Sequence, residues 1–369
     1  MSYDYLIVGA GLYGATFAQT LHKAGKKCLV IDKRNHIGGN TYCKDVGGIQ
    51  VHQYGAHIFH TNDKRIWDFV NQFVKFNPFI NSPKAKYFNE VYNLPFNMNT
   101  FKQLWGITDE KEAQHKIELE TAPYKNIKPT NLKEQALAMV GPTIFEKMIK
   151  HYTEKQWGRS CDELPAFLIK RVPLRFTFDN NYFNDTYQGI PVGGYNKLTE
   201  GLLEGIEVRL DTDFILDKEY WLSQANTVVY TGKIDAYFNY QLGELQYRSL
   251  RFDHVLMEDV SDFQNNAVFN HTSPNLPYTR VVEHKHFDWK DVTHTVVSFE
   301  YPETYKRGGE AYYPINDDLN NNLYTQYKKI ASQQTNVIFG GRLAEYKYYD
   351  MHQVIAAALH QANKIITHG

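Results

Sequence analysis

The sequence predicts an α/β fold that combines a Rossmann-like dinucleotide-binding domain with an inserted helical domain and an antiparallel β-sheet substrate domain. The first observation is a glycine fingerprint, Gly9-Ala-Gly11-Leu-Tyr-Gly14, placed between a short apolar run and a stretch with helical spacing. The second is the polar segment 97–170, which has little β-branched alternation and contains helical patterns. The third is the segment 246–300, where extended runs rich in aromatic residues and valine indicate an antiparallel sheet.

Each part of the fingerprint has a physical role in holding a pyrophosphate. Gly9 allows the tight turn after the apolar run Tyr5–Val8, Gly11 lets the backbone approach a pyrophosphate, and Gly14 lets the next helix pack close to the sheet. We expect the diphosphate at the free N–H groups of the helix N-terminus, where the helix dipole favours negative charge. Asp32 ends a second buried run 21 residues after Gly11, where it can accept hydrogen bonds from a ribose diol.

The residues after Asp32 favour FAD over a nicotinamide cofactor. Arg34 belongs to a basic pair, and the doublet Gly38-Gly39 with Asn40 follows it closely. A nicotinamide enzyme normally enters its next helix at this point, whereas a glycine doublet here resembles the second pyrophosphate contact of FAD proteins with the glutathione-reductase type of fold. A surface loop with two turn glycines is the alternative that needs no ligand.

The remaining patterns divide the chain into three expected domains. The run Thr227–Gly232 reads as a strand that returns to the first sheet, and Asn336–Arg342 is a second strand that ends in a glycine pair. An amphipathic helix is expected over residues 350–366. We therefore expect an FAD-binding domain from residues 1–80, 191–240 and 330–369, a helical domain from residues 97–175, and an antiparallel substrate domain from residues 81–96, 176–190 and 241–329.

Composition argues against several classes of protein. The chain has 40 basic and 41 acidic side chains, so no basic field points to nucleic acid or to an anionic membrane surface. Its three cysteines, Cys28, Cys43 and Cys161, show no paired spacing, which predicts a reducing, cytoplasmic location without disulfides or structural zinc. No signal-peptide pattern is present, and no run approaches the roughly 20 apolar residues that span a bilayer.

Two histidines in the segment Tyr54–Thr61 are candidates for the reaction site. His57 and His60 are three residues apart, but the neighbouring glycine and β-branched residues argue against a helix. No acidic residue or third histidine stands at ligand spacing, so the sequence predicts no metal site. We expect a histidine beside the flavin ring or the sugar, and a hydrogen-bonded structural histidine is the alternative for either one.

Aromatic residues and arginines mark two more candidate segments. The helical end Tyr152–Trp157 can stack on a nucleobase, and Arg171 on a nearby proline-bounded loop can hold a phosphate by paired hydrogen bonds. Trp157 as core and Arg171 as a solvated surface charge are the alternatives. Arg280, together with the tyrosine groups 312–313 and 346–349, suggests phosphate recognition through hydroxyl groups.

Several common catalytic motifs are missing. The sequence has no G-x-S-x-G, no Walker loop, no second fingerprint for NAD(P)H and no cysteine pair that relays electrons. The chain therefore reads as a flavoprotein without an electron-donor module. A flavin amine oxidase or desaturase and a non-catalytic nucleotide-binding protein are the alternatives, although arginines and phenols suit an anionic substrate better than an apolar one.

Short segments more specific than the glycine fingerprint carry a resemblance to a known family. They are Lys33–Asn40, Tyr54–Thr61, Tyr152–Trp157, Asn180–Phe183, Pro277–Arg280, Glu283–His286, Gly340–Leu343 and Tyr348–Met351. With these segments the chain resembles bacterial UDP-galactopyranose mutases over essentially its whole length. The resemblance implies a homodimeric isomerase that interconverts UDP-galactopyranose and UDP-galactofuranose without net redox change. Reduced FAD would act through its N5 as the nucleophile on the anomeric carbon, and the product would serve cell-surface polysaccharide synthesis.

The resemblance also implies roles for individual residues. Arg171, on a mobile loop, and Arg280 would hold the diphosphate and offset charge on the leaving UDP, and His60 would lie against the flavin or the galactose. The implied substrate site comprises Tyr152, Thr153, Trp157, Tyr182, Tyr313, Tyr348 and Asp350. The implied FAD-binding residues are Gly9, Gly11, Gly14, Asp32, Arg34, Gly39, Asn40, His57, Gly341, Arg342 and Met351.

Overall fold

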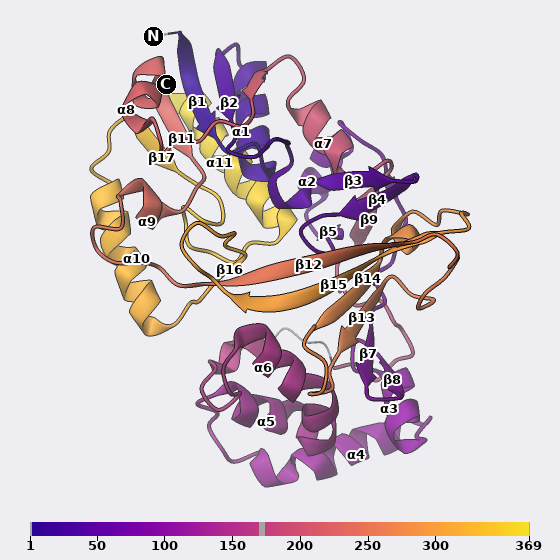
Figure 1. Ribbon diagram of the computed structural model, residues 1–369. Helices are drawn as coiled ribbons and strands as arrows, with labels where there is room; N and C mark the ends of the chain where they lie inside the picture. The colour runs from indigo at the N-terminus through magenta and orange to yellow at the C-terminus, as the bar shows by residue number, and fades with distance from the viewer. Residues whose placement is uncertain (1, 170–173, 369) are drawn as a thin grey trace.

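A parallel sheet of five strands forms one end of the molecule in the computed structural model, which describes residues 2–169 and 174–368 (Figure 1). Its strand order is β10-β2-β1-β11-β17, and every pairing is parallel. The strands are β1 (Tyr3–Val8), β2 (Cys28–Ile31), β10 (Glu207–Arg209), β11 (Ala225–Tyr230) and β17 (Val337–Phe339). All four residues of β2 are buried, as a continuous apolar run in a sheet covered on both faces requires.

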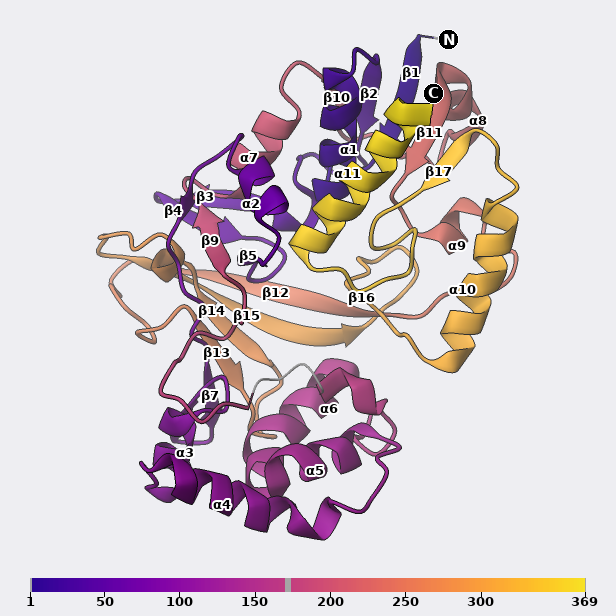
Figure 2. The ribbon, with the colours of Figure 1, turned by 180° about the vertical axis from the view of Figure 1, so that it is seen from behind.

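Helices cover both faces of this sheet. Ile7 and Val30 point to a core shared with α1 (Leu12–Lys23), α7 (Tyr195–Leu202) and α11 (Met351–His368). Their neighbours along the strands, Leu6 and Leu29, point to the opposite core, which contains residues of α8 (Lys218–Gln224) and α9 (Ile234–Tyr237). Figure 2 shows α11 lying beside α1. None of the described helices combines the length and apolar character needed to cross a bilayer.

A seven-stranded sheet crosses the middle of the molecule, in the order β16-β12-β15-β14-β13-β7-β8. All its pairings are antiparallel except that between β13 and β7. The strands are β7 (Lys84–Tyr87), β8 (Glu90–Asn93), β12 (Tyr247–Met257), β13 (Val268–His271), β14 (Arg280–Glu283), β15 (Thr295–Thr304) and β16 (Tyr313–Pro314). The long β12–β15 ribbon confirms the antiparallel sheet expected from residues 246–300 (Figure 1).

A helical unit lies on the far side of this sheet from the parallel one (Figure 1). It contains α3 (Met98–Trp105), α4 (Glu110–Thr121), α5 (Leu132–Ile144), a π-helix (Phe145–Lys150) and α6 (His151–Trp157), and a separate α10 (Asp318–Ala331) packs near β12. Asn97, Asp109 and Asn131 cap α3, α4 and α5 with side-chain oxygens. Gly141, with φ of 77°, precedes Pro142 and separates two helical stretches, as the sequence patterns predict.

Two small sheets connect these parts. β3 (Cys43–Val46) pairs with β4 (Ile49–His52), and β9 (Tyr187–Pro191) lies between β5 (Phe59–Thr61) and β6 (Phe76–Asn77). The helix α2 (Lys64–Val70) is shorter than the apolar spacing up to Phe73 suggests. It ends there because Asn71 caps it and donates a side-chain hydrogen bond to the Trp67 carbonyl at 2.8 Å.

Candidate functional site

A cavity of about 1120 Å³ lies between the parallel sheet, the seven-stranded sheet and α6. The ends of β1 and β11 open into it, and so do the start of β14 and four residues of α6, Tyr152, Thr153, Gln156 and Trp157. In parallel α/β sheets ligands bind at the carboxyl ends of the strands, so the position agrees with the glycine fingerprint. The cavity brings together Gly9, Gly11, Asp32, Arg34, Gly39, Asn40, His57, His60, Tyr152, Thr153, Trp157, Tyr182, Arg280, Tyr313, Gly341, Arg342, Tyr348, Asp350 and Met351.

Among the expected residues that the structure describes, Gly14 does not line the cavity. Gly14 lies beneath it, and a Cβ there would overlap the carbonyl oxygen of Gly9, which is the close helix packing expected of the third fingerprint glycine. Arg171 lies outside the described residues. Its role therefore stays a prediction.

The fingerprint forms a cradle with room for a pyrophosphate. Gly9 adopts φ of 109°, and a Cβ on Gly11 would meet only the Cα of Gly39, at 3.7 Å. The buried Asp32 accepts hydrogen bonds from the backbone N–H of Ala10 at 2.7 Å and of Arg34 at 2.9 Å. These bonds fix the carboxylate at the mouth of the cradle, and its remaining lone pairs can still accept from a ribose.

Arg34 lies in a network that sequence reasoning did not include. Its guanidinium donates to Glu310 at 2.7 Å and to Asn40 at 3.0 Å, and it stacks 4.3 Å above the ring centroid of Tyr54. Burial opposes its charge, but Glu310, Tyr54 and Asp32 together outweigh this effect and raise the pKa of Arg34. The arginine is thus held as a flat cation at the end of the cradle.

The hydrogen bonds of Arg342 indicate whether the cavity suits a cofactor. It donates to the Tyr312 carbonyl at 2.8 Å, whereas its buried Nε has no hydrogen-bond partner among the described residues. A buried guanidinium donor without a partner is costly, so an acceptor atom from a bound group fits this position. Together with the glycine cradle, the site fits a dinucleotide such as FAD.

His57 is held as a neutral imidazole. Its Nδ1 lies 2.8 Å from the carbonyl oxygen of Gly55, which only accepts, so Nδ1 carries the proton and Nε2 is left as an acceptor. Burial lowers the pKa of His57 to about 4. Its backbone N–H donates to Nδ1 of the buried His52 at 3.1 Å, which fixes the loop that carries the ring.

His60 is oriented from two sides. Its Nδ1 pairs with Asp185, and its ring stacks on Phe183 with 3.8 Å between centroids. Asp350 and His352 bring ligand atoms within 4.8 Å of His60 in a group that could hold a metal ion, although Asp185 already occupies Nδ1 of His60. Sequence patterns do not indicate Asp185 as a site residue, because its partner His60 lies 125 positions away in the chain.

Arg280 is the main cation at the opposite wall of the cavity. It donates to the Tyr152 hydroxyl at 3.1 Å and to Asn270 at 3.3 Å, and it lies 3.6 Å from the carboxylate of Glu300. Glu300 is only 1% exposed, and neither of its carboxylate oxygens has a hydrogen-bond partner among the described residues. Burial disfavours charge on Arg280, but Glu300 and Tyr152 outweigh it and raise its pKa well above the usual value.

Phenol groups complete the wall around Arg280. Tyr313 and Tyr348 stack with 5.4 Å between ring centroids, and burial raises the pKa of Tyr313 well above 10, so its hydroxyl stays protonated. Among the described residues, this wall thus presents the cation of Arg280 and several phenol groups toward the glycine cradle. That combination suits an anionic substrate held against the cofactor.

Comparisons with known proteins support one family. The family model described as UDP-galactopyranose mutase matches residues 147–348, which is more than half of the chain, and a model of an NAD(P)-binding Rossmann-like domain matches residues 7–73. The chain is 36% identical to a probable UDP-galactopyranose mutase of Klebsiella pneumoniae, covering 99% of this chain and 95% of that protein. The chain belongs to the UDP-galactopyranose mutase family.

Not all members of similar sequence carry the same name. A dTDP-fucopyranose mutase of Escherichia coli is also 36% identical, over 98% of both chains. A crystal structure of a reduced UDP-galactopyranose mutase has a TM-score of 0.76 at 13% identity, covering all of this chain and 96% of that one. A putrescine oxidase with a TM-score of 0.58 at 13% identity shares the fold of the mutase family, so the fold alone does not separate isomerase from oxidase.

Proposed function

We propose that this protein interconverts UDP-galactopyranose and UDP-galactofuranose, with FAD as its cofactor. The observation that carries the proposal is the placement of Arg280, with its tyrosine neighbours, across a single cavity from the glycine cradle. A diphosphate bound at Arg280 puts the attached sugar toward the flavin end of that cavity. The family membership supports the same reaction.

The chain's own residues bind and orient the substrate. The nucleophile for the anomeric carbon is supplied by the reduced flavin when it is bound. Arg280 holds the diphosphate and offsets the charge that develops as UDP leaves, which is stabilisation of the transition state by a fixed cation. Arg171 is proposed as the second arginine, on the loop that closes over substrate.

Further residues complete the proposed site. Tyr152, Thr153 and Trp157 bind the uridine, and Tyr182, Tyr313 and Tyr348 donate to the phosphates above Asp350. His60, oriented by Asp185, lies against the sugar or the flavin. Gly9, Gly11, Asp32, Arg34, Gly39, Asn40, His57, Gly341, Arg342 and Met351 contact FAD, and Gly14 supports the cradle. We further propose a cytoplasmic homodimer that serves cell-surface polysaccharide synthesis.

The first experiment measures turnover. Purified protein with bound flavin is incubated with UDP-galactofuranose, with and without dithionite, and formation of the pyranose is followed by chromatography. Conversion only after reduction is expected. No conversion by protein that holds reduced flavin would reject UDP-galactofuranose as the substrate.

A second candidate substrate comes from the Escherichia coli relative, which is as similar to this chain as the Klebsiella protein. The alternative is a dTDP-linked 6-deoxy sugar, which differs from the first substrate in both the nucleotide and the sugar. Side-by-side measurement of kcat/KM for UDP-galactofuranose and dTDP-fucofuranose decides between them. We expect the UDP sugar to be preferred, and a higher kcat/KM for the dTDP sugar would reverse the assignment.

A further inference from the structure

A partly buried ammonium group joins the helix α6 to the loop that precedes Arg280. Lys155 Nζ donates to the main-chain carbonyl oxygens of His271, Ser273, Leu276 and Tyr278, at distances of 2.9, 3.0, 3.1 and 3.0 Å. Among the described residues no carboxylate forms an ion pair with this lysine. The whole β13–β14 loop is therefore folded around one cation.

The arrangement is a carbonyl cage rather than an ordinary lysine contact. An ammonium group has three N–H donors, yet four carbonyl oxygens converge on it at nearly equal distances. Rings of backbone carbonyls of this kind replace the hydration shell of a monovalent cation in other proteins. Without the cation the four carbonyl dipoles would face one another in a partly buried place, where Ser273 is only 1% exposed and His271 only 7%.

Both sides of the cage carry residues of the proposed site. On α6, Lys155 lies between Thr153 and Trp157, which line the cavity. On the other side, the loop runs directly into Thr279 and then Arg280 at the start of β14. The cage therefore sets the distance between the nucleotide-binding helix and the arginine that faces it.

Two weaker contacts also join α6 to the residues at the end of this loop. Thr279 donates its hydroxyl to the side chain of Gln156 at 3.3 Å, and Arg280 donates to the Tyr152 hydroxyl at 3.1 Å. Both contacts require the loop to stay in register with α6. Of these three links between α6 and the loop, only the one made by Lys155 contacts the loop along its length, from His271 to Tyr278.

We propose that Lys155 is a positioning residue whose ammonium, held by four main-chain carbonyls, places Arg280 at the correct distance from the nucleotide pocket on α6. The inference rests on the proposed function, since it concerns how the same site grips the nucleotide and the diphosphate. Lys155 itself does not line the cavity, so it acts through the loop and not by touching the substrate. Burial lowers the pKa of Lys155 to about 8, which leaves the ammonium charged at neutral pH.

Three substitutions separate charge, shape and packing. Lys155→Ala removes the ammonium group and the side chain that carries it to the cage. Lys155→Met keeps a long side chain there but has no charge. Lys155→Arg keeps the charge, but its planar fork cannot direct donors at four converging carbonyls. The control is Lys133→Ala, which removes an exposed lysine of α5 paired with Asp162.

The assay is chemical rescue on the flavin-loaded, reduced enzyme with UDP-galactofuranose, combined with calorimetric titration of UDP. For all three variants we expect kcat to fall about tenfold or more and UDP to bind more weakly, since a displacement of about 1 Å can cost roughly 100-fold. n-Propylammonium, which replaces the atoms that the alanine lacks, should restore several-fold activity and UDP affinity to Lys155→Ala. It should not restore Lys155→Met, and tetramethylammonium at equal ionic strength should restore neither.

Contrary results have distinct meanings. Wild-type kinetics in Lys155→Met or Lys155→Arg, or a Lys155→Ala defect that n-propylammonium leaves unchanged, would overturn the positioning role. If Lys155→Ala does not fold, the Met and Arg variants decide by the same criterion. Failure of the wild-type enzyme to convert UDP-galactofuranose would count against the proposed function, and UDP affinity of the variants relative to wild type would still test Lys155.

Discussion

Arg280 illustrates how the position of a single charged side chain is expected to affect the rate of the proposed reaction. Its guanidinium is held by Tyr152, Asn270 and Glu300, so removing it leaves a buried carboxylate without its cation. We expect Arg280→Ala to lower kcat by about 100-fold or more, as loss of a preorganised charge-stabilising group does. Steady-state kinetics with UDP-galactofuranose measures this. Arg251→Ala, which removes a half-exposed arginine of β12, is the matched control and should change kcat little.

Trp157 distinguishes binding from packing. It lines the cavity and also packs against the helical core, whereas Trp105 packs against the same core without lining the cavity. Trp157→Ala should weaken UDP binding about tenfold or more, since stacking on a base contributes about 1–3 kcal/mol. Trp105→Ala should destabilise the fold and leave the UDP dissociation constant unchanged. Equal UDP affinity in both variants, measured by calorimetry, would make Trp157 a core residue only.

The residues that sequence reasoning found and missed differ in where their signal lies. Arg280 and the tyrosines stand in distinctive short segments, so they could be predicted locally. Glu300 could not, because its role depends on the β14–β15 register, which places it directly opposite Arg280. Lys155 lies within the segment Tyr152–Trp157, but the sequence does not indicate its role, because its partners are main-chain atoms over 100 residues away.

The turn between β1 and α1 belongs to the scale of elements, and it offers a clean test of the cofactor site. A methyl group on Gly11 would meet only Gly39 Cα at 3.7 Å, an ordinary contact, and Gly11 has no positive φ. Gly11→Ala should therefore fold normally but lose flavin, because the methyl group would occupy the path of the pyrophosphate. Flavin absorbance per mole of purified protein measures this. Full flavin content in a folded Gly11→Ala protein would contradict the proposed cradle.

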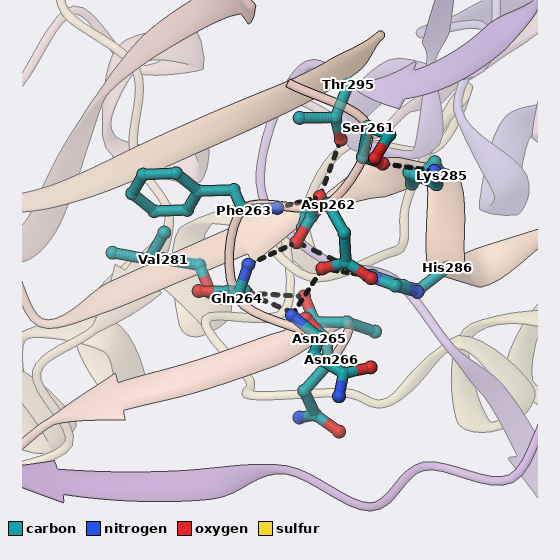
Figure 3. Close-up of polar contacts among 12 residues, drawn as sticks. Ser261, Asp262, Phe263, Gln264, Asn265, Asn266, Val281, Lys285, His286 and Thr295 are labelled. Atoms are coloured by element: carbon teal, nitrogen blue, oxygen red, sulfur yellow. Dashed lines mark hydrogen bonds and ion pairs between the residues drawn. The ribbon is translucent and has the colours of Figure 1, made fainter. Parts of the chain in front are cut away.

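The middle of the loop between β12 and β13 is held by a buried carboxylate. Figure 3 shows the polar contacts around this part of the loop, from Ser261 to Asn266. Glu283 is fully buried and accepts from the backbone N–H groups of Phe263 and Gln264, both at 2.8 Å, and from the Thr295 hydroxyl at 2.8 Å. His286 lies 3.3 Å away as its cationic partner. Burial opposes the charge on Glu283, but these bonds outweigh it and lower its pKa below 4.5, whereas Glu283 raises the pKa of His286 above 6.5.

These opposite shifts predict a pH dependence of stability. The contribution of His286 is complete below pH 6.5 and is lost as pH rises through its folded pKa, and that of Glu283 is present above pH 4.5 and is lost as pH falls through its folded pKa. His286→Gln should therefore reduce the free energy of unfolding more at about pH 6 than at about pH 9. Urea unfolding measures both values, with the exposed His115→Gln as control. An equal loss at the two pH values would show that the ion pair contributes nothing.

Elements with a strong local pattern were predictable, and those set by distant contacts were not. The strand expected in the run Asn336–Arg342, before its glycine pair, is β17 (Val337–Phe339), and the helix expected over 350–366 is α11 (Met351–His368). The strand is a short apolar run that ends at a glycine pair, and the helix has a long apolar pattern that begins after Asp350. The π-helix Phe145–Lys150 between α5 and α6 has no distinct periodicity in the sequence, because it arises where these helices pack against the sheet.

The whole molecule assembles its parallel sheet from segments that are far apart in the chain. β1 pairs with β11, more than 200 residues later, and β11 pairs with β17 near the C-terminus. The lining of the cavity comes from the same three regions, since Gly11, Thr231 and Gly341 all line it. A bound dinucleotide would therefore join the first, middle and last parts of the fold.

This organisation predicts that cofactor binding stabilises the entire chain. A ligand that binds only the folded state adds about 2.7 kcal/mol to the free energy of unfolding at 100 times its dissociation constant. Protein freed of flavin should thus unfold at a lower temperature, and titrated FAD should raise the melting temperature with increasing concentration. NAD⁺ at equal concentration is the matched control for a Rossmann-like domain and should have no effect. A shift with NAD⁺ and none with FAD would reverse the cofactor assignment, because the same cradle would then hold a nicotinamide dinucleotide.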